Sequence, residues 1–223
     1  MAASKVSRLR PAEPAPRPAA TTEPTRISQT ERREIAERAI LQAAKTIVAE
    51  RGLDELTLNA AGEAAGYSRA LPAHYFKTKA ALVSALVDSI IADYAPRVRQ
   101  SLTPGDGIER LIERVGFYID DACRDPVTLR AFQAILAAGL THPELRPLVD
   151  RLNSESIDGI AILIRRARDK GDIRADARPR AEASLILAAM RGVMFQWLIN
   201  PEQVRISTIK DALITHVRLS LAP

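Results

Sequence analysis

One segment near the N-terminus constrains this chain more than any other: residues 57–79, TLNAAGEAAGYSRALPAHYFKTK. Thr57 is a hydroxyl residue directly before a run of helix formers, which is the position of an N-cap. Gly66 follows that run, and glycine suits this place because it adopts a positive φ without steric cost. Ser68 is then predicted to cap a second helix and Thr78 a third. Two short helices joined by a tight turn form a helix-turn-helix, whose second helix can enter a DNA groove.

The charge of this segment fits contact with nucleic acid. No Asp or Glu occurs in the 24 residues between Glu63 and Asp88, although 26% of the whole chain is charged. Arg69, Lys77 and Lys79 lie in this interval. Because phosphates repel carboxylates, a surface that approaches DNA is depleted of acidic residues. A solvated helix pair with a chance shortage of acids is the alternative interpretation.

Composition and periodicity predict an all-α chain. The 223 residues are 47% hydrophobic but only 4% aromatic, and Ala and Leu dominate, which favours helices packed on helices. Apolar residues recur at spacings of three and four, without sustained alternation. The length suffices for one large domain or two modest ones. The net charge of +5 says little about the body, because residues 1–30 alone carry five basic and two acidic residues.

Several features indicate a cytoplasmic protein without a membrane partner. The single cysteine, Cys123, excludes an internal disulfide framework and suggests a reducing compartment. No apolar run approaches the roughly 18 residues that span a bilayer. The N-terminal sequence RLRPAEPAPRPAA lacks the apolar core of a signal peptide.

The chain divides into an arm and two helical sections. Residues 1–27 are rich in Pro, Ala and Arg and are predicted to be a disordered basic arm. Order is predicted to begin at a capping box of Ser28 and Glu31, and residues 28–77 to form a three-helix bundle. The sequence TPGDG marks the clearest break later in the chain.

Residues 78–221 are predicted to form the second helical section. Its helices are expected from Thr78 to about Arg97, over 108–122, from Asp125-Pro126, from a capping box at 141–144 to about Lys170, over 180–200, and over 202–219. The 180–200 segment is apolar around nearly its whole circumference, which requires burial on several sides.

Residues 40–86 resemble the TetR family of bacterial transcriptional regulators. The resemblance is carried by Arg51-Gly52, by Thr57, by AGYSR at 65–69 and by HYFKTK at 74–79. It implies an N-terminal helix-turn-helix DNA-binding bundle and a C-terminal helical ligand-binding and dimerisation domain. It further implies a repressor that binds a near-palindromic DNA operator as a homodimer through residues 180–219 and responds to an unknown small-molecule effector.

The resemblance also assigns DNA-binding residues. Thr57 and Lys79 are expected at phosphates, where free N–H groups of helix N-termini favour an anion. Ser68, Arg69 and His74 are expected to face the groove. The remaining members of the set are Tyr75, beside the DNA backbone, Asn59 and Ala70.

The chain departs from the family pattern in the second helix of the helix-turn-helix. Many members have an aromatic residue near its middle, where this chain has Leu71-Pro72-Ala73. With Ser68 as N-cap, Pro72 is the fourth helical residue and disturbs the first turn, so we expect a short or distorted recognition helix. The alternative function is therefore a helical small-molecule-binding or interaction protein with a degenerate DNA-binding head.

Candidate effector-binding residues are the larger side chains outside the Ala and Leu background of the C-terminal helices. They are Phe117, Tyr118, Phe132, Met190, Arg191, Met194 and Trp197. Bulky apolar residues on buried helices usually belong to the core, and we expect that role for most of them. Arg191 differs, because a buried guanidinium must find an acid, a carbonyl or an anionic ligand. The last of these would give the effector an apolar body with an acidic or carbonyl end.

The sequence offers no enzymatic site. Its three histidines lack a second His or Cys at metal-ligand spacing, and it has no nucleophile elbow, P-loop or dinucleotide fingerprint. Asp120 and Asp121 are adjacent, but neighbours on a helix point about a third of a turn apart and are not expected to share a site. We therefore expect neither catalytic residues, nor a metal site, nor a cofactor.

Overall fold

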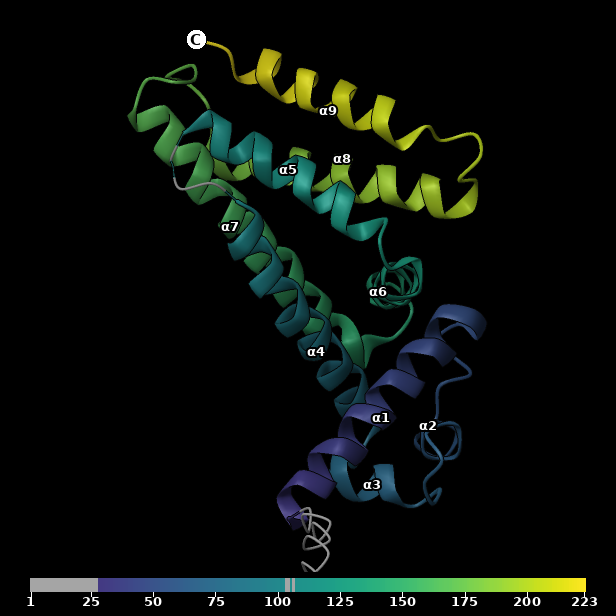
Figure 1. The fold of residues 1–223 in the computed structure, drawn as a ribbon. Coiled ribbons are helices and arrows are strands. Elements are labelled where there is room, and N and C mark those ends of the chain that lie inside the picture. Colours follow the sequence, from purple (N-terminus) through teal and green to yellow (C-terminus); the bar gives the residue numbers. More distant parts are fainter. Residues whose placement is uncertain (1–27, 103–104, 106) are drawn as a thin grey trace, which may run out of the picture.

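The computed structural model describes residues 28–102, 105 and 107–223, and among those residues it has helices and no β-strand. The all-α prediction is therefore confirmed. The arm predicted over residues 1–27 lies outside the described residues. Figure 1 shows helices α1–α3 at one end of the molecule and α4 leading from them toward the remaining helices.

Helix α1 (Gln29–Arg51) begins at the predicted capping box. The Glu31 amide donates to the Ser28 hydroxyl over 3.1 Å, and the Ser28 amide donates to the Glu31 carboxylate over 2.7 Å. The helix ends at Gly52, whose φ of 89° lies in the region that glycine favours. Both ends of α1 follow from local sequence signals.

The helix-turn-helix consists of α2 (Leu58–Ala64) and α3 (Leu71–Phe76), and α4 (Lys79–Ser101) follows it. The predicted caps of α2 and α4 are confirmed. The Thr57 hydroxyl accepts a hydrogen bond from the Ala60 amide over 3.0 Å, and the Thr78 hydroxyl accepts one from the Ala81 amide over 3.1 Å. These caps satisfy backbone donors that have no partner inside the helix.

The predicted N-cap at Ser68 is wrong. Ala70 is the N-cap of α3 and makes no side-chain capping bond. Ser68 lies in the preceding turn, where its backbone carbonyl accepts a hydrogen bond from the Leu71 amide over 3.1 Å. Pro72 is therefore the second helical residue, where a missing N–H removes no intrahelical bond. The recognition helix is short, at six residues, but the proline fits its first turn.

The C-terminal section contains one 3-10 helix and five α-helices. They are α5 (Ile108–Ala122), α6 (Pro126–Ala138), η1 (Pro143–Leu145), α7 (Arg146–Asp169), α8 (Pro179–Ile199) and α9 (Ile206–Leu221). The predicted cap of α6 is confirmed, since the Asp125 carboxylate accepts from the Thr128 amide over 3.0 Å. The capping box predicted at 141–144 is wrong: His142 precedes η1 without a side-chain cap, and the Thr141 hydroxyl bonds to its ring over 3.0 Å.

Buried apolar residues form two clusters. The first joins α1–α4 to residues of α6, η1 and α7, among them Ile135 and Leu145. The second joins α5, α7, α8 and α9, with Val115, Ile164 and Met194 at its centre. The N-terminal helices are consequently not an isolated head, because α1 packs along α6.

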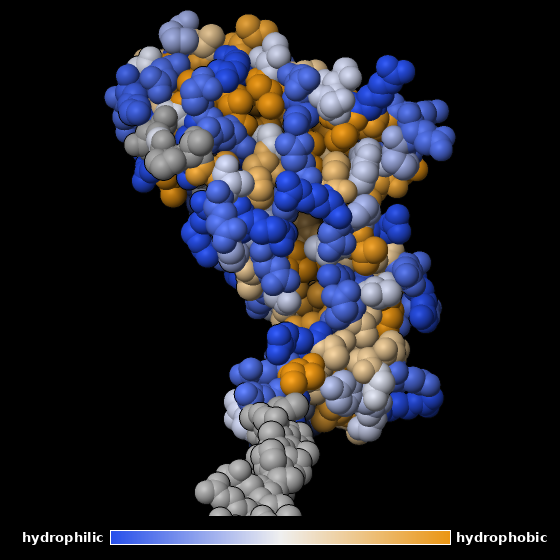
Figure 2. Space-filling view, viewed as in Figure 1, coloured by the Kyte–Doolittle hydropathy of each residue, from blue (hydrophilic) through white to orange (hydrophobic). Residues whose placement is uncertain are grey.

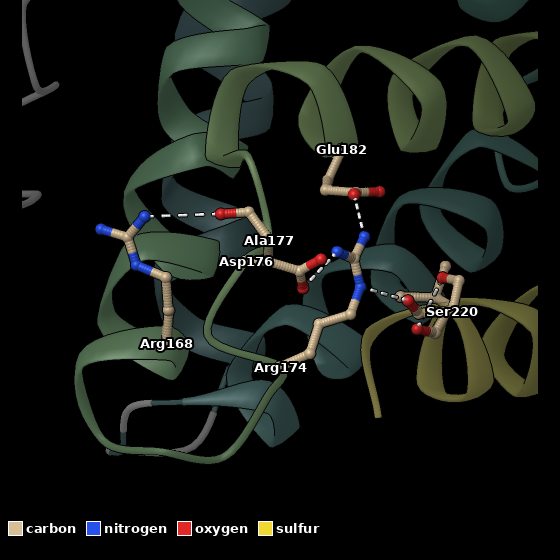
Figure 3. A network of polar contacts seen from close by, with 7 residues as sticks. Arg168, Arg174, Asp176, Ala177, Glu182 and Ser220 are labelled. Atoms are coloured by element: carbon tan, nitrogen blue, oxygen red, sulfur yellow. Dashed lines mark hydrogen bonds and ion pairs between the residues drawn. The ribbon is translucent and has the colours of Figure 1, made fainter. Parts of the chain in front are cut away.

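A polar network holds the end of α9 against the start of α8 (Figure 3). Arg174, in the α7–α8 loop, donates to the Ser220 carbonyl over 3.0 Å and to the Asp176 carboxylate over 2.8 Å, and also binds Glu182 of α8. The Arg174 amide donates to the Leu221 carbonyl over 3.0 Å. One side chain thus fixes three segments that are distant in the sequence.

Candidate DNA-binding surface and ligand cavity

Most of the predicted DNA-binding residues are exposed, on α2, the turn and α3 or directly before them. The exposed members are Thr57, Asn59, Ser68, Arg69, Ala70 and His74. Thr57 caps α2, so its hydroxyl is occupied by the Ala60 amide while its side chain remains at the surface. The cap leaves other first-turn amides of α2 without a partner inside the helix, and such amides attract a phosphate.

Tyr75 and Lys79 are less exposed than the other members of the set. The Tyr75 ring is half-buried beside Phe76, and the Arg33 guanidinium of α1 lies 5.4 Å from its centroid. Lys79 begins α4, and its ammonium group donates to the Asp54 carbonyl over 3.4 Å. The sequence indicated neither Arg33 nor Asp54, because both come near the helix-turn-helix only through tertiary packing.

An acidic side chain from outside the acid-free interval at 64–87 contacts a basic residue within it. Glu63, the last acid before the interval, forms an ion pair with Arg69 at 2.9 Å, and both side chains are largely exposed. An exposed pair of this kind contributes little stability, about 0–1 kcal/mol. Arg69 is therefore held at the surface by a partner that a DNA phosphate or base can replace at small cost.

A cavity of about 850 Å³ lies between the two sections of the molecule. Six helices wall it: α1 through residues 38–45, α4 through 86–97, α5 through 114–122, α6 through 125–132, α7 through 152–160 and α8 through 187–191. The volume is in the range of small-molecule sites, roughly 300–1,000 Å³. In Figure 2, apolar surface is visible in a furrow between polar flanks in the middle of the molecule.

Four of the seven predicted effector-binding residues lie in the cavity wall: Tyr118, Phe132, Met190 and Arg191. The other three lie elsewhere. Phe117 packs against the Tyr94 ring at 5.9 Å between centroids, Met194 is fully buried in the second cluster, and Trp197 lies at the edge of that cluster. Phe117 differs from Tyr118 because successive residues of a helix face different directions.

The cavity wall also contains charged pairs that sequence reasoning missed. Arg97 of α4 binds the buried Asp121 carboxylate of α5 through two hydrogen bonds, of 2.8 and 2.9 Å. The hydrogen bond to Asp121 raises the pKa of Arg97. Asp120 turns away and binds Lys210 over 2.8 Å, so the two adjacent acids serve different partners, as predicted. Lys45 of α1 pairs with Asp125 at 3.9 Å.

Arg191 and Tyr118 lie in the wall without an acidic partner among the described residues. Arg191 donates to the amide oxygen of Asn153, and its backbone carbonyl accepts from Gln133 over 3.1 Å. Burial lowers the pKa of Arg191. Burial also raises the pKa of Tyr118 to about 12, although the charge of Arg191 opposes that rise. The Tyr118 hydroxyl is buried and has no hydrogen-bond partner in the described part of the chain.

Two family models match separate parts of the chain. Residues 40–86 match the family model of the bacterial regulatory proteins of the tetR family. Residues 107–222 match the model of the C-terminal part of the BetI-type transcriptional repressor. The second match covers slightly more than half of the chain.

Individual relatives are distant in sequence and close in fold. The HTH-type transcriptional regulator BetI of Rhizobium meliloti (strain 1021) is 28% identical over 137 residues, which are 58% of this chain and 66% of that protein. The solved structure of a transcriptional regulator from Saccharomonospora viridis in complex with choline has a TM-score of 0.73 and 19% identity, covering 85% of this chain and 99% of that one. The solved structure of FadR of Bacillus subtilis in complex with stearoyl-CoA has a TM-score of 0.72 and 15% identity, covering 81% of this chain and 96% of that one.

Proposed function

This chain belongs to the TetR family of bacterial transcriptional regulators, and on that premise we propose that it is a ligand-controlled repressor. It binds a near-palindromic operator as a homodimer and leaves the operator when a small molecule fills the cavity between its two sections. Transcriptional regulators of this family are DNA-binding proteins and not enzymes. The division of labour follows the predicted domains, with DNA contact in residues 28–77 and effector binding and dimerisation in 78–221.

The observation that carries this proposal is that α1 forms part of the cavity wall. Residues 38–45 of α1 line the cavity, while other faces of the same helix pack against α2 and α3. A ligand in the cavity therefore contacts the helix on which the DNA-reading helices rest. Such a ligand shifts the equilibrium between two head positions by the difference in its affinity for them.

Three further contacts connect the head to the body. Lys45 of α1 pairs with Asp125 at the start of α6, at 3.9 Å. Asp54, in the α1–α2 loop, lies 3.1 Å from the ring of His142, which precedes η1. Lys79 binds the carbonyl of the same Asp54. A displacement of α6 is therefore transmitted to the C-terminal half of α1 and to the loop that follows it.

The mechanism requires two heads at a fixed separation. A symmetric dimer reads half-sites about 34–36 Å apart, one turn of DNA, so a small change in head spacing releases one half-site. Arg97 is the residue of α4 that we expect to sense the ligand, because its bond to the buried Asp121 lies in the cavity wall. Movement of α4 then displaces Lys79, the first residue of that helix.

The exposed apolar face of α8 and α9 supports dimerisation through residues 180–219. Leu185, Phe195, Ile199 and Leu219 are 53–73% exposed. By length and hydropathy α8 could also cross a membrane, and 28% of its most apolar 18-residue stretch is buried in the monomer. A partner helix pair covers such a face, and a two-fold axis brings the same surface from both copies.

We assign the DNA contacts to the residues expected from the sequence. Thr57 and Lys79 position the head on phosphates, while Ser68, Arg69 and His74 approach base edges. Tyr75, half-buried beside Arg33 of α1, lies along the DNA backbone. Asn59 and Ala70 complete the set.

A binding assay with DNA from the chain's own upstream region tests the proposal. Fluorescence anisotropy at near-physiological salt is expected to show saturable binding at least about 1,000-fold tighter than binding to unrelated DNA. Binding that occurs only at low salt and to any sequence would instead support the alternative of a degenerate head.

A further inference from the structure

Arg191 is an unusual cation within the cavity wall. The side chain is partly buried, and its hydrogen-bond partner is the neutral amide oxygen of Asn153. None of the described carboxylates forms an ion pair with it, and the nearby titratable group that affects it is Tyr118. A guanidinium taken from water into such a site loses hydration that a neutral amide replaces only in part.

Most other charges of the cavity wall are paired or lie at its surface, and the half-buried Arg114 lies over the Tyr94 ring. Arg97 binds Asp121, Lys45 pairs with Asp125, and Glu155 pairs with Arg151 of the same helix at 3.7 Å. Three more charged wall residues, Arg38, Asp93 and Arg124, are exposed to solvent. The uncompensated charge inside the cavity is therefore positive.

The Tyr118 hydroxyl provides a second polar group beside Arg191. It is buried without a partner among the described residues, and its electrostatic interactions are with Arg191 and Tyr94. The phenol remains protonated at neutral pH, so it can donate a hydrogen bond. An oxygen atom that accepts from both Arg191 and Tyr118 would satisfy both groups at once.

Most of the remaining wall is apolar. Its larger apolar residues are Leu41, Leu86, Ile90, Ile91, Leu129, Phe132, Leu152, Ile160, Leu187 and Met190, and its uncharged polar residues include Gln42, Ser89, Thr128 and Ser156. In a mostly apolar pocket, a few polar groups orient a ligand by its polar end.

We propose that this cavity binds an apolar carboxylic acid, with the carboxylate on Arg191 and the hydrocarbon body along the apolar wall; the proposal rests on the ligand-controlled function above. A guanidinium suits a carboxylate because its planar fork of donors matches the two oxygens. A quaternary ammonium ligand is disfavoured. It would meet the unpaired charge of Arg191, and the Arg114 guanidinium already lies over the Tyr94 ring at 5.9 Å.

Three probes with the same tail and different heads separate the possibilities. Calorimetric titration of the full-length protein with decanoate, 1-decanol and decyltrimethylammonium, each below its aggregation limit, compares an anion, a neutral group and a cation. We expect decanoate to bind at least about ten-fold tighter than decanol, as for a charge-assisted hydrogen bond, and the cation to bind weakest. Equal affinity for decanoate and decanol, or tightest binding of the cation, overturns the proposal.

Variants of Arg191 and Tyr118 test whether these side chains cause the preference for decanoate over decanol. Arg191→Gln is expected to reduce the ratio of decanoate to decanol affinity to about one, and Arg191→Lys to restore part of it, since the ammonium is a point charge without the fork. Tyr118→Phe is expected to weaken decanoate by about three- to ten-fold. Arg130→Gln, an equal charge change at an exposed position of α6 outside the cavity wall, is the matched control and keeps the wild-type ratio.

Two independent measurements distinguish a failure of the acid site from a failure of the repressor function on which it rests. Ligand affinity is measured without DNA, and operator affinity is measured without ligand. Specific operator binding combined with no preference for the acid overturns the acid site alone. A preference for the acid without specific operator binding overturns the repressor function and leaves the acid site standing. An Arg191→Gln protein that keeps the acid preference while its oligomeric state changes in light scattering places Arg191 at the dimer contact and overturns the assignment.

Discussion

Pro72 of the recognition helix packs directly on Gly62 of α2. A Cβ built on Gly62 would lie 2.9 Å from Pro72 Cδ and 2.8 Å from the Ser68 carbonyl oxygen. The glycine therefore allows the two helices to approach each other, and the proline occupies the space that a side chain at residue 62 would fill. The departure of Leu71-Pro72-Ala73 from the family pattern is thus accommodated within the turn.

Gly62→Ala is expected to lower the stability of the head by about 1–3 kcal/mol, because a backbone carbonyl and a rigid ring must both move. Thermal unfolding followed by circular dichroism measures the change. Gly159→Ala in the exposed middle of α7, where a Cβ meets nothing within 4 Å, is the matched control. That substitution is expected to be neutral or to stabilise by up to about 1 kcal/mol. Equal effects of the two substitutions would refute the packing argument.

The Glu63 carboxylate competes with DNA for the Arg69 guanidinium, so Glu63→Gln is expected to tighten operator binding. Arg69→Ala is expected to weaken operator binding and to relax the sequence preference at one base pair by about 1–3 kcal/mol. Anisotropy titrations against the operator and single-base variants measure both changes. If neither variant differs from wild type, Arg69 does not contact DNA.

Lys79→Ala is expected to weaken binding to all sequences alike and to reduce the slope of log affinity against log salt by about one, as for the loss of one phosphate contact. The measurement is a salt series on operator and unrelated DNA. Lys210→Ala, which removes an equal charge from α9 where Lys210 binds Asp120, serves as the control. An unchanged slope in Lys79→Ala would contradict the phosphate assignment.

Leu185→Glu is expected to convert dimers into helical monomers, because it places a charge on the exposed apolar face of α8. Light scattering gives the mass, and circular dichroism shows that the helices persist. Leu140→Glu introduces the same change at a residue that is 83% exposed in the α6–η1 turn, and it is expected to leave the dimer intact. Leu213 is unsuitable for this test, since it is 8% exposed within the core of its own chain. A stable Leu185→Glu dimer would place the interface elsewhere.

Tyr118 is expected to make stability fall between about pH 10 and pH 12. Burial raises its pKa from 10.0 to about 12, so the folded state holds its proton more strongly than the unfolded state. The resulting contribution, on the order of 2–3 kcal/mol, is present below pH 10 and is lost as the pH rises through the folded-state pKa. Denaturant unfolding of wild type and Tyr118→Phe over this range measures it. Parallel curves for the two proteins would show that Tyr118 titrates normally.

Features that depend only on neighbouring residues could be predicted from the sequence. The caps at Ser28, Thr57, Thr78 and Asp125 were predicted because each hydroxyl or carboxylate bonds to an amide three residues ahead. The glycine after α2 has the same local origin, and so does the separation of the side chains of Asp120 and Asp121.

The start of the second helix of the helix-turn-helix, and the pairs of residues that meet across the molecule, became clear from the folded chain. Ser68 has the residue type of an N-cap, yet Ala70 takes that role, and Pro72 in the first turn of α3 packs on Gly62 of α2. Arg97 of α4 binds Asp121 of α5. Helix α1 reaches the cavity because it packs along α6. Periodicity tells which face of a helix is apolar, but not which other helix covers it, since that depends on the summed burial of many distant side chains.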